Sequence, residues 1–185
     1  MKFGKDLATN MVKKWEVHYI DYEAMKRILT TGNTPEVKRE FHAMYEAQLK
    51  KVSAFYLSEV ARVEQAVATR NTQLKAMSAV DEVQTSGQHY QVFRDLTDLR
   101  SFTWINAEGF RKIAKKYDKL MDLRGTDATE AEMLEAQLLR EPFMGNKIQE
   151  FLDGLKGDKA WSRVKTGDGA MELKIISGTA NHGLA

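Results

Sequence analysis

The stretch TPEVKREFHAMYEAQLKKVSAFYLSEVARVEQAVATRNTQLKAM, residues 34–77, decides the fold of this 185-residue chain. Thr34 can cap a helix whose first position is Pro35, and Glu36 complements the positive end of the helix dipole. From there apolar side chains recur at steps of three, four and seven residues, at Phe41, Tyr45, Leu49, Val52, Tyr56, Val63, Val67, Leu74 and Met77. This spacing predicts one very long amphipathic helix over roughly residues 35–79.

A second long amphipathic track follows the first. We expect the polar break Thr85-Ser86-Gly87 to separate the two helices, with a connection over residues 79–88. We expect the second helix to end near Arg124-Gly125, because glycine suits a helix end. Between these limits the apolar positions again follow helical spacing, at Phe93, Leu96, Leu99, Thr103, Phe110, Ile113, Tyr117 and Leu120.

Shorter helical segments are expected on either side of this pair. Residues 1–32 predict a hairpin of two short helices, with Trp15 near its bend and Gly32 ending the second. A capping box over residues 129–132 predicts a helix to about residue 140. Pro142 then begins another helix, which we expect to run to about residue 155.

These elements together predict the fold class. Neither long helix can bury its apolar stripe alone, so the two must share a face. We therefore expect an all-α helical bundle with two long antiparallel helices, a small N-terminal helical hairpin and two short C-terminal helices. Residues 1–160 are expected to form this domain, and the glycine-containing residues 161–185 a flexible tail or linker.

Composition restricts the classes of partner. The chain has 28 basic and 26 acidic residues, so its bulk charge predicts affinity for neither nucleic acid nor membranes, and a cationic site must come from clustering. Cysteine is absent, which excludes disulfides, and the four histidines show neither metal-ligand nor catalytic-triad spacing. No apolar run is long enough to span a bilayer. We expect a soluble, cytoplasmic chain, with no cofactor, no metal and no enzymatic activity.

The clustered charge lies on the second long helix. Lys112, Lys115, Lys116 and Lys119 fall within an arc of roughly 100° on a helical wheel, away from the apolar sector. Like charges at this spacing repel one another, and Asp118, the acidic residue within this stretch, points elsewhere on the wheel. The cluster therefore predicts a site for an external anion.

The N-terminal hairpin offers a second half of such a site. Tyr22 and Lys26 are four residues apart and share a helix face, where a phenol hydroxyl and an ammonium group can both donate to a phosphate oxygen. Lys2 lies at the start of the chain, where helix-initial amides also favour anions. A ligand with several phosphates could be held between the two helices. Asn106, on the apolar track, is expected to be a satisfied buried polar group.

Several motifs stand in register along residues 1–155. They are Met1-Lys2-Phe3-Gly4-Lys5, the hairpin from Trp15 to Lys26, Phe102-x-x-Ile105-Asn106-x-x-Gly109-Phe110-x-Lys112-Ile113 with the lysines that follow, and Glu141-Pro142-Phe143. Together these motifs resemble the SPX domain, a eukaryotic helical module that reads cellular phosphate status by binding inositol polyphosphates and pyrophosphates. The chain departs from the family at Lys13-Lys14-Trp15, where SPX domains usually have Pro-Glu-Trp.

The resemblance implies both a site and a function. In SPX domains a tyrosine and a lysine of the second helix and a lysine of the long fourth helix bind the ligand's phosphates, and a neighbouring lysine cluster lines the same ligand. The matching residues here are Tyr22, Lys26 and Lys116, then Lys112, Lys115 and Lys119, with Lys2 near the ligand. The implied function is a sensor that binds inositol hexakisphosphate or inositol pyrophosphates between hairpin and long helix and regulates an attached or partner protein.

The family also indicates which partners to expect. Its effectors are phosphate transporters, polyphosphate polymerases, phosphodiesterases and transcription regulators, either fused to the domain or separate from it. A parent protein could therefore hold this chain at the cytosolic face of a membrane. Whether the long helices form a homodimer stays open.

Two other functions compete with the sensor. The lysines could be an ordinary solvated face on a helical protein-interaction module, which would show little preference among multiply charged anions. Single-stranded nucleic-acid binding is disfavoured, because the basic face lacks interleaved exposed aromatic residues.

Overall fold

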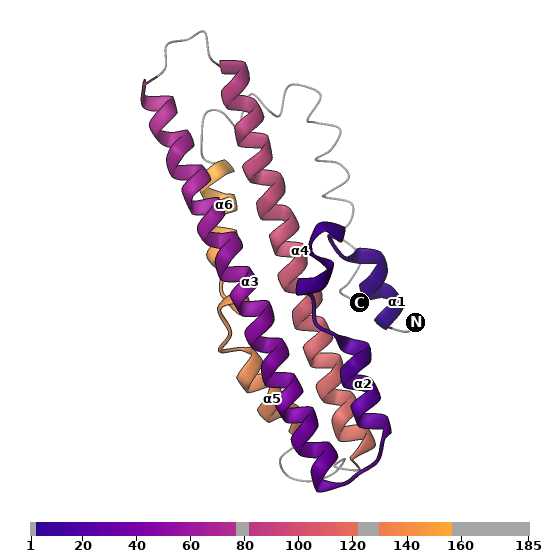
Figure 1. Ribbon diagram of the computed structural model, residues 1–185. Coiled ribbons are helices and arrows are strands. Elements are labelled where there is room, and N and C mark those ends of the chain that lie inside the picture. The colour runs from indigo at the N-terminus through magenta and orange to yellow at the C-terminus, as the bar shows by residue number, and fades with distance from the viewer. Residues whose placement is uncertain (1–2, 77–81, 122–129, 157–185) are drawn as a thin grey trace, which may run out of the picture. The chain divides into compact units, whose positions relative to one another are not determined.

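The computed structural model describes residues 3–76, 82–121 and 130–156 (Figure 1). Helices are the regular elements throughout these ranges, which hold no strand, so the predicted all-α class is confirmed. In chain order the elements are α1 (Phe3–Asn10), the 3₁₀ helix η1 (Lys13–His18), α2 (Tyr22–Thr30), α3 (Pro35–Ala76), α4 (Glu82–Leu120), α5 (Glu130–Leu138), the 3₁₀ helix η3 (Pro142–Met144) and α6 (Lys147–Lys156).

The chain divides into two compact units, and both long helices contribute to each. The first unit contains Met1–Ala61 and Asp98–Asn146, and the second contains Arg62–Thr97 and Lys147–Ala185. The boundaries fall inside α3 and α4. The described residues of the predicted ligand site all belong to the first unit: Tyr22, Lys26, Lys112, Lys115, Lys116 and Lys119.

An aromatic core joins α3 to α4 in the first unit. Ring centroids are 4.8 Å apart for Phe41 and Tyr117, 5.1 Å for Tyr45 and Phe110, and 4.9 Å for Phe55 and Phe102. Residue numbers rise along one helix as they fall along the other, so the predicted antiparallel pairing is confirmed. Four of these six rings lie on the predicted apolar tracks, and Phe55 and Phe102 lie outside them. Most track members are buried, and every described track residue of α3 from Phe41 to Val63 has a relative exposure of 3% or less.

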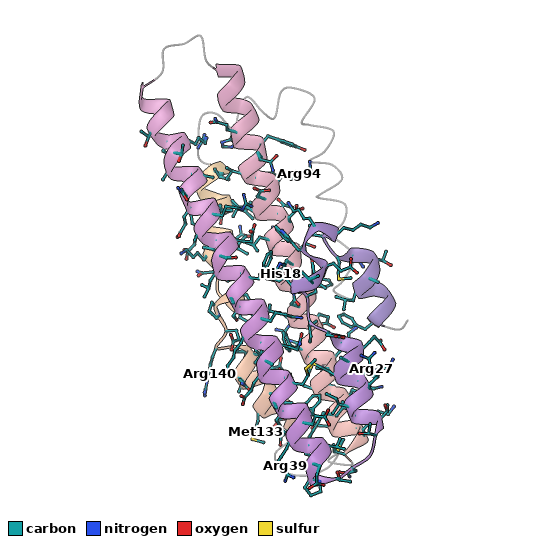
Figure 2. All side chains as sticks on the ribbon, viewed as in Figure 1. His18, Arg27, Arg39, Arg94, Met133 and Arg140 are labelled. Carbon is teal, nitrogen blue, oxygen red and sulfur yellow. The ribbon has the colours of Figure 1, made fainter. Side chains whose placement is uncertain are left out.

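The N-terminal segment packs onto this core through η1. Trp15 and Tyr19 are buried, with ring centroids 6.0 and 4.7 Å from that of Phe102. His18, labelled in Figure 2, stacks on Phe55 of α3 at 4.1 Å. The predicted hairpin of two short helices, α1 and α2, is confirmed, and Trp15 lies in the turn of 3₁₀ helix between them.

The second unit packs α6 against the remaining parts of the long helices. Its apolar core includes Val63, Leu96 and, from α6, Ile148 and Leu152. The Lys147 ammonium lies 2.5 Å from a carboxylate oxygen of Glu64, which links the start of α6 to α3. Arg62 and Asp95 form a second ion pair, between α3 and α4, at 2.8 Å.

The expected polar break at residues 85–87 was wrong. These residues are helical, because α4 begins at Glu82 and continues for 39 residues. A glycine inside a helix costs only about 1 kcal/mol relative to alanine, and a long helix that packs along its length absorbs that cost. The expected 79–88 connection is therefore shorter, and residues 77–81 lie outside the described residues. The helix ends at Leu120, and the expected end near Arg124 also lies outside the described residues.

The C-terminal helices agree with expectation in part. The first, α5, matches the segment expected to end near residue 140. The expected continuous helix from Pro142 to residue 155 was wrong, since it is divided into η3 and α6. Gly145 has an extended backbone, with φ −76° and ψ 177°, and so ends η3 before α6 begins. The expected tail over residues 161–185 lies outside the described residues.

Candidate functional site

Two hydrogen bonds fix α2 along the C-terminal part of α4. At one end the buried Ile20 amide donates to Asn106 Oδ1 at 2.8 Å, and Asn106 Nδ2 donates to the Phe102 carbonyl at 2.8 Å. At the other end Asn33 Nδ2 donates to the Met121 carbonyl at 3.3 Å. The two helices therefore run side by side in the same direction (Figure 1). Asn106 was expected to be a buried polar residue with its hydrogen bonds satisfied. This prediction is confirmed, since its side chain is fully buried and both of its polar atoms are hydrogen-bonded.

Gly109 lets the N-terminal segment approach α4 closely. A Cβ atom at this position would lie 2.9 Å from Ile20 Cγ2 and 3.3 Å from Phe3 Cε1. Such distances leave no room for any other residue without movement of the packed neighbours. Gly109 of the Gly109-Phe110 motif therefore has a steric function. Because it has no side chain, α1 and the residues before α2 can pack closely against α4.

Phe3 joins three elements of the predicted site. Its ring contacts that of Tyr22 edge-on, with centroids 5.0 Å apart. On another side, the Lys112 ammonium lies 5.0 Å from the centre of the same ring. Tyr22 of α2 and Lys112 of α4 thus converge on one aromatic side chain of α1, although they are ninety residues apart in sequence. No property of the sequence alone indicated that Phe3 would make this connection.

Helical spacing places the other two main residues beside this point. Lys26 follows Tyr22 by one turn, and Lys116 follows Gly109 by seven residues, which returns it to the face that Gly109 presents to the hairpin. Lys26 lies about 6 Å beyond Tyr22 along α2, and Lys116 lies about 6 Å beyond Lys112 along α4, so both are one turn past the residues that contact Phe3. Because α2 and α4 run in the same direction (Figure 1), the side chains of Lys26 and Lys116 lean the same way along the pair of helices.

The exposure of the site residues suits a surface ligand. Tyr22, Lys26 and Lys116 are half-buried, while Lys112, Lys115 and Lys119 are exposed. Burial, with a contribution from the neighbouring Glu23, raises the pKa of Tyr22 above its ordinary value of 10.0. Its hydroxyl therefore keeps its proton at neutral pH and remains a hydrogen-bond donor. Lys2 lies outside the described residues, so its expected place near the ligand stays a prediction.

Two lysines of the predicted site form ion pairs with acidic residues that the sequence analysis did not name as their partners. The Lys26 ammonium is 2.7 Å from a carboxylate oxygen of Glu23, and Lys112 is 3.4 Å from Glu108. The expectation that the lysine cluster has no acidic partner was therefore wrong for Lys112. The i,i+3 and i,i+4 spacings of these two pairs were the signal in the sequence.

Asp118 does point elsewhere, as expected. It is buried, and its carboxylate accepts a hydrogen bond at 3.1 Å from the amide of Ala131 in the first turn of α5. Arg111 is likewise drawn toward α5, by its pair with Glu135 at 3.1 Å. Within the described chain, no ion pair reaches Lys115, Lys116 or Lys119. Three of the four clustered ammonium groups are thus available to an anion from outside.

The described residues lack two other kinds of feature, a metal-binding cluster and a membrane-spanning helix. In residues 3–76, 82–121 and 130–156, no group of three or more His, Cys, Asp or Glu side chains is arranged to hold a metal ion. None of the helices described there is both long and apolar enough to cross a membrane.

Comparison with known proteins relates this arrangement to one family. The SPX domain family model matches residues 84–129. An SPX domain-containing membrane protein of Oryza sativa subsp. indica is 29% identical over 140 residues, which cover 69% of this chain and 20% of the relative. Solute carrier family 53 member 1 of Mus musculus is 27% identical over 175 residues, covering 69% of this chain and 25% of the relative. The chain thus spans a quarter or less of these two proteins.

The fold has a counterpart among solved structures. The SPX domain of Chaetomium thermophilum Glycerophosphodiester Phosphodiesterase 1, solved in complex with inositol hexakisphosphate, superposes with a TM-score of 0.75. The match covers 88% of this chain and 98% of that one, at 22% sequence identity. With the family match over residues 84–129, this shared fold confirms the resemblance of the chain to the SPX domain.

Proposed function

We propose that this chain is a phosphate-status sensor that binds inositol hexakisphosphate or inositol pyrophosphates between the N-terminal hairpin and the lysine face of α4. The observation that carries the proposal is the convergence of Tyr22 and Lys112 on Phe3, with Lys26 and Lys116 one turn away on their helices. The solved SPX domain of similar fold, which was obtained with inositol hexakisphosphate, supports this choice of ligand.

Each residue would have a simple role in such a site. The Tyr22 hydroxyl and the ammonium groups of Lys26 and Lys116 would donate hydrogen bonds to phosphate oxygens. Around them, further lysines would supply positive charge to the remaining phosphates: Lys112, Lys115, Lys119 and Lys2. Lysine suits a ligand with many phosphates in several orientations, because an ammonium group is a point charge with freely rotating donors.

The ligand would change the protein by neutralising repulsion. Clustered lysines on α4 destabilise one another, and a polyanion that contacts both α4 and α2 removes that repulsion and fixes the hairpin on the long helix. Ligand occupancy can then bias a surface that an effector recognises. The relatives include membrane proteins and a solute carrier, so we infer an effector of the transporter kind in a longer parent protein, with this chain on the cytosolic side.

Isothermal titration with inositol hexakisphosphate tests the proposal. We expect micromolar or tighter binding that Lys116→Ala weakens by about 10- to 150-fold, the equivalent of about 1.5–3 kcal/mol for a hydrogen bond to a charged group. Lys13→Ala is the control, because Lys13 is an exposed lysine of η1 outside the site. Orthophosphate at equal ionic strength should not bind measurably. Weak binding that Lys116→Ala and Lys13→Ala reduce equally would instead favour the interaction module.

A further inference from the structure

Glu23 differs from Glu108, the other acidic residue that contacts a lysine of the site, because it lies against both α1 and α2. One of its carboxylate oxygens lies 2.7 Å from the Lys26 ammonium. The other oxygen occupies the space beside Gly4 of α1 where a side chain would otherwise begin. Glu23 therefore lies between α1 and α2, next to Tyr22 in sequence and in contact with a lysine of the proposed site.

Glu108 makes a weaker contact of the same kind. It is 3.4 Å from Lys112, one turn away on the same helix, and Lys112 also contacts the Phe3 ring. Of these two acidic residues, Glu23 makes the shorter ion pair, and its partner Lys26 is the lysine that α2 contributes to the proposed site. Any anion that binds to Lys26 must either displace the Glu23 carboxylate or lie beside its negative charge.

We propose that Glu23 is an internal competitor of the polyanion, which occupies Lys26 in the unliganded protein and thereby sets the affinity and selectivity of the site. The inference rests on the proposed function and extends it to a residue outside the predicted ligand set. A ligand with one phosphate gains too few contacts to offset the loss of the Glu23–Lys26 pair. A ligand with several phosphates engages α4 at the same time, so it can displace Glu23 and still bind.

The chain offers a closely matched control for Glu23. Glu64 and Lys147 form an ion pair of 2.5 Å in the second unit, with side-chain exposures of 45% and 48%, against 51% and 38% for Glu23 and Lys26. Removing either carboxylate raises the net charge of the protein by one. Only the loss of Glu23 also releases a lysine of the site and removes a negative charge beside it, so the difference between the two variants excludes the effect of net charge.

The experiment is isothermal titration of inositol hexakisphosphate into the wild type and the variants Glu23→Gln, Glu23→Ala and Glu64→Gln at one fixed ionic strength. We expect Glu23→Gln and Glu23→Ala to bind about three- to tenfold more tightly than the wild type, because an exposed ion pair and a repulsive charge are both removed. Glu64→Gln should stay within about twofold. A purely structural role for Glu23 would weaken binding rather than strengthen it.

The inference is overturned if the wild type binds inositol hexakisphosphate and the Glu23 variants bind no more tightly than Glu64→Gln. A different result would overturn the proposed function itself: a folded wild-type protein, by circular dichroism, that binds no inositol hexakisphosphate. In that case Glu23 has no polyanion to compete with, and its pair with Lys26 is an ordinary surface contact. The two failures are therefore distinguishable in one set of titrations.

Discussion

At the scale of single residues, the proposed site depends on the absence of a side chain as much as on the lysines. Gly109 faces Ile20 and Phe3 at distances that exclude a Cβ atom, so its effect comes from what it leaves out. The sequence shows that Gly109 belongs to a motif, but it does not show why a glycine is needed at this position. The two side chains that approach it come from residues about a hundred positions earlier in the chain.

Gly109→Ala should therefore destabilise the protein although alanine is the better helix former. The new methyl group would overlap the packed Ile20 side chain, and overpacking of this kind costs about 1–3 kcal/mol, against about 1 kcal/mol gained in helix propensity. Gly154→Ala in α6 is the control, because no atom lies within 4 Å of the position its Cβ would take. It should stabilise the protein by up to about 1 kcal/mol.

Urea unfolding of the two glycine variants measures this difference. The midpoint should fall for Gly109→Ala and stay or rise for Gly154→Ala. Equal or higher stability of Gly109→Ala would mean that the hairpin does not pack on α4 as the structure describes. Reduced binding of inositol hexakisphosphate by Gly109→Ala should accompany its lower stability, since the same contact seats α1 and α2.

At the scale of the elements, the apolar spacing was sufficient to predict the two long helices. It was not sufficient to predict where the short helices pack. The steps of three, four and seven residues predict α3 to within a few residues, because a helix of that length repeats its signal many times. The start of α4 was missed, because Thr85, Ser86 and Gly87 have low helix propensity, and a helix of 39 residues can include a few such residues. The position of α2 depends on single long-range bonds that leave no periodic signal.

Asn106 shows which properties of a residue the apolar spacing predicts and which it does not. Its place on an apolar track predicts a buried, satisfied polar side chain, which is correct, but its partner is the amide of Ile20, 86 residues away. The capping of α5 is similar: Asp118 of α4 bonds to its first turn. The lysine face could be predicted from one helix alone, and Tyr22 and Lys26 could be proposed as the second half of the site. The individual contacts that hold α2 on α4 could not be predicted.

Asn106→Leu should loosen α2 while keeping the number and branching of the side-chain heavy atoms. The Ile20 amide would be left buried without its acceptor, and an unsatisfied buried donor costs about 1–3 kcal/mol. Amide hydrogen exchange should show faster exchange at Ile20 and through the first turn of α2, with a lower unfolding midpoint. Unchanged exchange at Ile20 would contradict the role assigned to Asn106. Thr97→Val, which removes a hydroxyl bond within α4 alone, is the control for a local polar loss.

At the scale of the whole molecule, a nearly neutral chain carries the whole described part of the proposed site in one unit. The net charge of +2 predicts little affinity for a polyanion, so the proposed binding requires the local cluster on α4 and α2. That cluster lies entirely within the first unit, whereas α6 and its ion pair to Glu64 belong to the second. The ligand should therefore stabilise the two units unequally.

Hydrogen exchange with and without inositol hexakisphosphate tests this distribution. A ligand at a hundred times its dissociation constant stabilises the state that binds it by about 2.7 kcal/mol, which slows exchange wherever opening requires ligand release. We expect slower exchange in α1, α2 and the part of α4 from Asp98 onward, and little change in α6. Lys116→Ala at the same ligand concentration should remove the protection. Protection that is centred on α6 and survives in Lys116→Ala would place the polyanion on the second unit, and the lysine face of α4 would then be a solvated surface.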